Sequence, residues 1–126
     1  MSFDWSEYLT LAQELTSAST SSPIQEAHLR AAISRAYYAA FCKARNYLLN
    51  KDGYVTPRNT NAHQDIITKF EGSGDMGRRK VGTLLRSLRV LRNIVDYEEI
   101  FSGNQLGRTQ GVLLNAGQVI RLLQTI

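Results

Sequence analysis

The sequence predicts an all-α protein, an antiparallel bundle of four or five helices that forms one domain over residues 1–126. Three observations support this fold class. Apolar residues recur at helical spacing in several segments. No segment alternates apolar and polar residues over enough positions to predict a β-strand. Short stretches rich in Gly, Pro and Ser, which are typical of loops, separate the helical segments.

The N-terminal part of the chain predicts a short helix and a long one. Residues 3–17 carry leucines at amphipathic spacing, and the small polar residues 17–23 form a linker. Residues 1–21 are therefore an N-terminal helix and linker ahead of the main bundle. A long helix follows from Pro23 to about Leu49, without glycine and with alanines on most of its sides. Small residues all round a helix permit close neighbours on several faces, so this helix is expected at the centre.

The C-terminal part predicts two more long helices and a short one. Residues 50–61 contain an Asp-Gly pair and a proline and predict a loop. Residues 62–71 have the spacing of a short amphipathic helix, which ends at a glycine-rich break. A long helix is predicted over residues 78–101. A turn from Gly103 to Gly107 then leads into the last helix.

Composition excludes several classes of protein. The chain has 15 Lys and Arg against 11 Asp and Glu, a net charge of +4 that permits a polyanionic partner. One cysteine, Cys42, rules out a disulfide framework, and two histidines are too few for a Cys/His zinc cluster. No metal site and no cofactor are expected. No membrane-length apolar segment or signal segment is present, so a cytoplasmic protein without a membrane partner is expected.

The segment 78–101 carries the most chemical information. Its leucines and valines fall on one arc of a helix, and polar residues fall on the neighbouring arc. Arg92 projects at the edge of the apolar arc. It either extends to water or pairs with Asp96 one turn further on, or it faces a partner chain or an anion. The basic residues on the polar arc are the candidate RNA-binding face: Arg78, Arg79, Arg86 and Arg89.

A second arginine, Arg35, lies on the long alanine-rich helix beside Tyr38. A guanidinium among small and aromatic residues needs a partner. The sequence predicts an ion pair between Arg35 and either Asp96 or Glu98, which would join the two long helices.

Two segments resemble a known family. The sequence SRAYYAAF at 34–41, followed about fifty residues later by LRNIVDYE at 91–98, is similar to the HEPN superfamily, most closely to its compact stand-alone prokaryotic branch. The resemblance implies a helical bundle that forms a homodimer. It also implies metal-independent RNA cleavage, in which a motif of arginine and histidine acts in a cleft between two protomers. Members of the family work in toxin–antitoxin or defence modules, some with a nucleotidyltransferase antitoxin.

The resemblance assigns roles to residues of this chain. Arg92 matches the motif arginine and Asn93 the polar residue that follows it, while Tyr97 stands at the position of the motif histidine and Asp96 precedes it. These four are the candidate catalytic residues, and Arg35 and Tyr38 are candidate supporting residues. Because Arg92 and Tyr97 differ by about 140° around a helix, we expect a second protomer to bring its own copies to the site.

Tyrosine at the histidine position leaves catalysis open. Tyrosine is a poor general base at neutral pH, although it can donate a proton. His28 or His63 can replace the histidine only if the fold brings one of them to the site. One expectation is therefore an RNA-cleaving or RNA-binding homodimer. The alternative is a non-catalytic HEPN module that binds a nucleotidyltransferase partner or a nucleotide. A third reading is a plain bundle in which the arginines are structural.

Overall fold

The computed structural model describes residues 2–59 and 61–126, and this part of the chain is helical with no strand. Within it, no helix is both long and apolar enough to cross a membrane. The helices in chain order are α1 (Glu7–Ser19), α2 (Gln25–Asp52), α3 (Ala62–Glu71), α4 (Met76–Tyr97) and α5 (Gln105–Thr125). The prediction of an all-α bundle is confirmed at this level.

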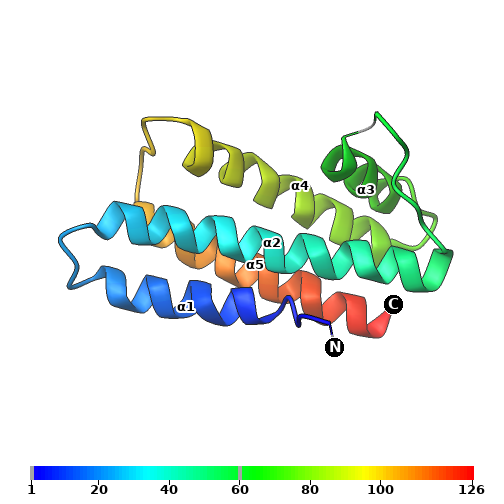
Figure 1. The fold of residues 1–126 in the computed structure, drawn as a ribbon, viewed down its shortest axis with the longest axis horizontal. Coiled ribbons are helices and arrows are strands. Elements are labelled where there is room, and N and C mark those ends of the chain that lie inside the picture. Colours follow the sequence, from blue (N-terminus) through cyan, green and yellow to red (C-terminus); the bar gives the residue numbers. More distant parts are fainter. Residues whose placement is uncertain (1, 60) are drawn as a thin grey trace.

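Four of the helices lie alongside one another, and α3 packs against α4 near one end of the bundle (Figure 1). The helices α1 and α2 run antiparallel, as do α4 and α5, whereas α2 and α5 run in the same direction. Helix α2 contacts all four other helices, so its predicted central position is confirmed. Its alanines explain the close packing, since Ala32, Ala36, Ala39, Ala40 and Ala44 are fully buried.

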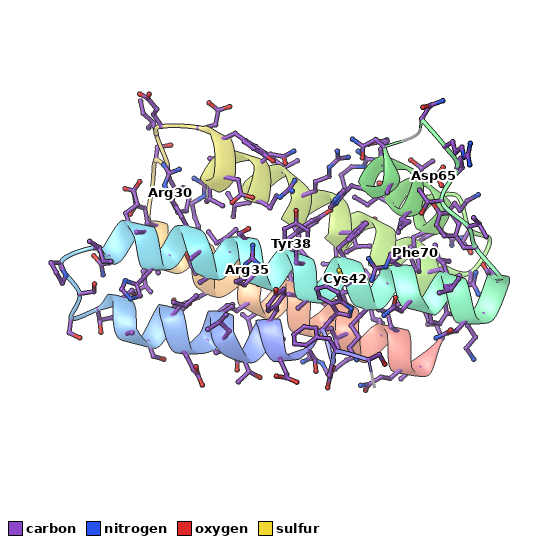
Figure 2. The ribbon with its side chains drawn as sticks, viewed as in Figure 1. Arg30, Arg35, Tyr38, Cys42, Asp65 and Phe70 are labelled. Carbon is purple, nitrogen blue, oxygen red and sulfur yellow. The ribbon has the colours of Figure 1, made fainter. Side chains whose placement is uncertain are left out.

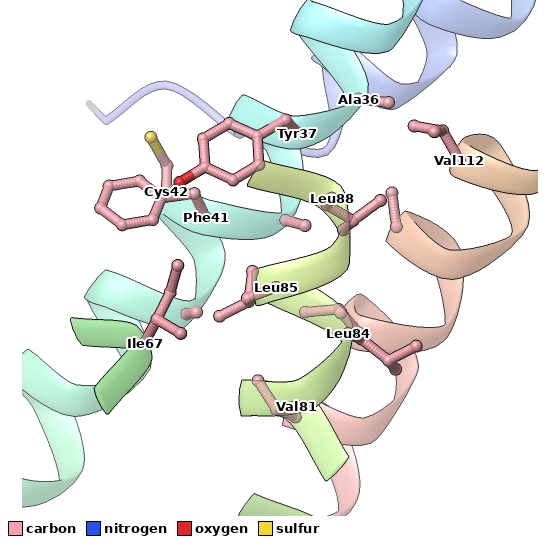
Figure 3. Close-up of a cluster of buried hydrophobic side chains, with 14 of the residues drawn as sticks. Ala36, Tyr37, Phe41, Cys42, Ile67, Val81, Leu84, Leu85, Leu88 and Val112 are labelled. Carbon is pink, nitrogen blue, oxygen red and sulfur yellow. The ribbon is translucent and has the colours of Figure 1, made fainter. Parts of the chain in front are cut away.

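The core forms where α2, α4 and α5 meet (Figure 3). The predicted apolar arc of α4 supplies Val81, Leu85 and Leu88, all at most 1% exposed. Helix α3 contributes Ile66, Ile67 and Phe70 to the same cluster. Gly82 lets α3 and α4 approach closely, because a Cβ there would lie 2.7 Å from the backbone nitrogen of Glu71.

The predicted boundaries of the first three helices need small changes. The short helix over residues 62–71 is confirmed. Helix α1 runs from Glu7 to Ser19, so it starts later and ends later than predicted. Helix α2 extends to Asp52 and ends there, because Gly53 adopts a left-handed conformation with φ of 65°. The N–H of Gly53 bonds to the carbonyls of Leu48 and Leu49. Thr60, which falls in the predicted loop, lies outside the described residues.

Helix α4 begins and ends earlier than predicted. The Asp75 carboxylate accepts from the backbone N–H of Arg78 at 2.8 Å and so caps the first turn. At the other end Glu98 is extended. Arg30 of α2 donates to the carbonyls of Val95, Glu98 and Glu99 at 2.7–2.9 Å. Figure 2 shows Arg30 beside the segment that joins α4 to α5. These bonds fix the chain as it leaves α4.

Candidate functional site

The candidate site is centred on Arg92, which is only 8% exposed. Its guanidinium carbon lies 5.4 Å from the ring centre of Tyr37, 5.1 Å from that of Tyr38 and 5.7 Å from that of Tyr97. Tyr38 points from α2 toward α4 (Figure 2) and accepts a short hydrogen bond from Arg92 Nη2. Burial lowers the pKa of Arg92, but the hydrogen bond to Tyr38 raises it and the net shift is upward. Arg92 is therefore a permanent cation in an aromatic setting.

The polar neighbours of Arg92 come from its own helix. Arg92 Nη1 donates to Asn93 Oδ1 at 2.8 Å. Asp96 Oδ2 lies 3.1 Å from Arg92 Nε and accepts from Ser34 Oγ at 3.3 Å. Arg92 Nε is buried and makes no hydrogen bond to any described residue, because the carboxylate lies outside hydrogen-bond geometry. Asp96 thus offsets the charge of Arg92 but leaves this donor unused.

The side chain of Tyr97 lies beside that of Arg92 within one chain. The sequence predicted that these residues diverge around the helix and that a second protomer brings its own copies to the site. Within one chain the long arginine side chain brings its guanidinium to 5.7 Å from the Tyr97 ring centre, so the two side chains do not diverge. The contribution of a second protomer stays a prediction. Tyr97 is the last residue of α4 and is 74% exposed. Its hydroxyl is therefore accessible to a ligand.

His63, at the start of α3, joins the same cluster. Its Nδ1 lies 2.6 Å from the hydroxyl of Tyr37, and its ring stacks on Phe41 with ring centres 4.1 Å apart. Burial, together with the charges of Arg92 and Arg89, lowers the pKa of His63 to about 4. His63 is therefore unprotonated at neutral pH. Burial also raises the pKa of Tyr37 above its ordinary value, so that hydroxyl keeps its proton.

The sequence left open whether His28 or His63 lies near Arg92, and the structure places only one of them there. His63 lies in the cluster around Arg92. His28 instead lies near the start of α2, with Nδ1 3.2 Å from the carbonyl oxygen of Ile24. No spacing in the sequence links His63 to Arg92, since their proximity depends on how α3 docks onto the bundle.

The predicted pairing of Arg35 is wrong. In the part of the chain that the structure describes, no carboxylate lies within ion-pair distance of Arg35, and Asp96 pairs with Arg92 instead. The Arg35 guanidinium lies over the rings of Tyr8 and Tyr38, at 5.0 and 5.4 Å. Aromatic faces thus replace the predicted carboxylate. Arg30 of α2, which the sequence did not indicate, also connects α2 to the end of α4.

All four arginines of the predicted basic face make contacts within the protein. Arg78 forms a bidentate ion pair with Asp52 at the end of α2. Arg86 forms one with Glu71 at the end of α3. Arg79 donates to the carbonyl of Ser73, and Arg89 donates to the side chain of Gln64 at 3.0 Å. Arg89 Nε is a second buried donor without a hydrogen bond to a described residue. Carboxylates offset the charges of Arg78 and Arg86. Arg89 lies one turn before Arg92 and has no carboxylate partner among the described residues, so its positive charge acts on the site.

A pocket of about 560 Å³ adjoins the site where α4 ends and α5 begins. Tyr97 and Ile94 line it, so it shares a wall with the surroundings of Arg92. The described residues contain no group of three or more His, Cys, Asp or Glu side chains placed to hold a metal ion. In comparisons with known proteins, no family model, no curated protein and no solved structure matches the chain.

Proposed function

We propose that this protein is a HEPN-type homodimer that binds RNA at the Arg92 site and cleaves it without a metal ion, within a toxin–antitoxin or defence module. The observation that carries the proposal is the environment of Arg92. The cation is almost fully buried, aromatic rings surround it, and its Nε has no hydrogen-bond partner among the described residues. Asp96 Oδ2 lies 3.1 Å from this nitrogen, so it is the charge of the whole guanidinium that would attract a phosphate.

The cluster contains the groups that metal-independent cleavage needs. In this reaction the ribose 2′-oxygen attacks the adjacent phosphorus, and the bond from phosphorus to the 5′-oxygen breaks. The products are a 2′,3′-cyclic phosphate and a 5′-hydroxyl. Arg92 stabilises the charge that develops on the phosphoryl oxygens. His63 is unprotonated at neutral pH, and it would accept the 2′-hydroxyl proton once the bound phosphate offsets the arginine charges that lower its pKa. The exposed hydroxyl of Tyr97 would donate a proton to the departing 5′-oxygen.

The outer face of α4 supports a homodimer. Exposed residues recur there every seven positions, which places them in one stripe along the helix. The stripe consists of Met76, Thr83 and Val90. Two copies of α4 packed antiparallel about a two-fold axis would bury this stripe and leave the end of α4, with Tyr97, open to a ligand.

RNA binding tests the proposal with a charge-matched pair of variants. Arg92→Gln removes the buried cation, and Arg121→Gln removes an exposed one on α5. Fluorescence anisotropy with a short single-stranded RNA should show binding that weakens steeply with salt, because phosphate contacts release counterions. Arg92→Gln should weaken binding by about tenfold or more, whereas Arg121→Gln should stay near wild type.

Three further measurements keep that test decisive. Circular dichroism establishes that Arg92→Gln is folded, and Arg92→Lys, which keeps the charge, should retain part of the affinity. Sedimentation equilibrium should show a dimer at tens of micromolar. Equal losses in Arg92→Gln and Arg121→Gln would mean that RNA is held only by the net positive charge.

One observation favours the alternative function. Tyr97 occupies the position that the motif histidine would take, and a tyrosine cannot act as a general base at neutral pH. A HEPN module without catalysis, which binds a nucleotidyltransferase or a nucleotide through the same surface, accommodates this residue. RNA binding without cleavage at any substrate would favour this alternative.

A further inference from the structure

The pocket at the end of α4 has the chemistry of a base-binding subsite. It is lined by side chains of three kinds: the aromatic and aliphatic Tyr97, Ile94 and Ile100, the acidic Glu98 and Glu99, and the polar Ser102 and Arg108. Tyr97 and Ile100 are 74% and 79% exposed, so the apolar wall is open to solvent. An exposed tyrosine beside aliphatic side chains offers a surface on which an unpaired nucleobase can stack.

The backbone around the pocket is held in place by two arginines. Arg30 donates to the carbonyls of Glu98 and Glu99 at 2.7 and 2.9 Å. Arg108 donates to the carbonyl of Ser102 at 2.7 Å, and its guanidinium carbon lies 5.0 Å from the ring centre of Phe101. The segment after α4 therefore has a defined shape before any ligand enters, which lowers the entropic cost of binding.

The two carboxylates on this segment are left available. Their backbone carbonyls are bonded to Arg30, but neither the Glu98 nor the Glu99 side chain has a hydrogen bond or ion pair with any residue that the structure describes. An ionised carboxylate only accepts hydrogen bonds. A ligand that fits this wall must therefore present donors, and a pair of adjacent donors suits a carboxylate best.

Among the four RNA bases, guanine meets these requirements. Its N1–H and N2–H form an adjacent donor pair for a carboxylate, and its O6 and N7 form an acceptor pair for an arginine. Adenine and cytosine present one donor next to one acceptor, and uracil presents a single donor between two acceptors. Glu98 or Glu99 together with Arg108 therefore suits guanine best, because guanine alone offers a carboxylate two adjacent donors from its Watson–Crick edge.

We propose that this pocket binds a guanine base of the RNA and so selects which phosphate lies at Arg92. The inference rests on the proposed function, because Tyr97 lines the pocket and also contacts Arg92. A guanine stacked on Tyr97 places its own backbone next to the buried cation. Binding and cleavage then occur beside guanosine rather than at random positions.

The test compares short A-rich RNA oligonucleotides that carry adenosine, guanosine or inosine at one central position. Inosine lacks the N2 amino group and keeps N1–H, O6 and N7. Wild-type protein should bind the guanosine oligonucleotide about tenfold more tightly than the adenosine one, equivalent to about 1.4 kcal/mol. Inosine should lose most of that preference, because the carboxylate then has one donor instead of two.

A charge-matched pair of double variants completes the test. Glu98→Gln with Glu99→Gln should abolish the preference for guanosine. Glu7→Gln with Glu14→Gln, on exposed residues of α1, changes the net charge equally and should keep it. RNA binding without a preference for guanosine, or a preference that the 98/99 variant retains, would overturn this inference alone. A wild-type protein that binds none of the oligonucleotides would overturn the proposed function, and this inference with it.

Discussion

The depressed pKa of His63 predicts how the stability of the protein depends on pH. In the folded protein the pKa is about 4, because burial and the nearby arginines oppose protonation, against an ordinary value of 6.5. Below pH 6.5 the unfolded chain therefore binds a proton that the folded protein rejects. The free energy of unfolding falls as pH drops from 6.5 toward 4 and is unaffected by His63 above that window.

The size of this effect follows from the two pKa values. Between pH 7.5 and pH 5 the difference amounts to about 2 kcal/mol at full strength. His63 is only partly buried, so solvent screening reduces the figure to about 1 kcal/mol. Stopping at pH 5 keeps most of the carboxylates ionised, so that their own titration contributes little.

Urea unfolding of the wild type and of His63→Asn at several pH values measures this contribution. Asparagine keeps a polar atom near the Tyr37 hydroxyl but does not titrate. The wild type should lose about 1 kcal/mol more than the variant between pH 7.5 and pH 5. Parallel stability curves for the two proteins would refute the placement of His63 beside Arg92 and Arg89.

Two pairs of substitutions test the packing that positions the site. Arg30→Ala should destabilise the protein by about 2–3 kcal/mol, because it removes three charge-assisted bonds to backbone carbonyls. Arg35→Ala should cost only about 1 kcal/mol, since it loses ring contacts, and thermal melting that ranks Arg35→Ala as the worse variant would contradict the corrected pairing. Gly82→Ala should destabilise by about 1–3 kcal/mol, because its Cβ would collide with the backbone of Glu71. Gly111→Ala, where a Cβ meets nothing within 4 Å, should stabilise α5 by about 0.5–1 kcal/mol, and urea unfolding that gives both glycine variants the same sign would count against the close contact of α3 and α4.

Much of the fold could be predicted because it depends on local pattern. The spacing of Val81, Leu85 and Leu88 determines which face of α4 is buried, and the structure buries that face. Helix ends were less accurate, since they depend on single contacts such as the left-handed Gly53 after α2. The spacing of apolar residues does not determine whether a polar residue at the end of a predicted helix belongs to the helix or to the following loop.

The candidate site was only partly predictable, because its geometry comes from tertiary contacts. The position of Arg92 at the edge of the apolar arc indicated a buried or shared cation, and its proximity to Asp96 follows from their spacing of four residues. The proximity of His63 depends on how α3 packs, and no local spacing encodes that. Arg30 and Arg35 differ in their partners for the same reason, since spacing along α2 does not show which of them reaches the end of α4.

Cleavage of RNA by purified protein in the presence of EDTA tests the central claim most directly. Wild-type protein should convert a guanosine-containing RNA into fragments that end in a 2′,3′-cyclic phosphate and a 5′-hydroxyl. Folded Arg92→Gln should cleave at least about a hundredfold more slowly, because it removes the cation to which the proposed mechanism assigns transition-state stabilisation. Equal rates for the wild type and Arg92→Gln would contradict the assignment of the site to Arg92. Intact RNA with folded, dimeric wild-type protein would contradict catalysis and leave the interaction module as the function of this surface.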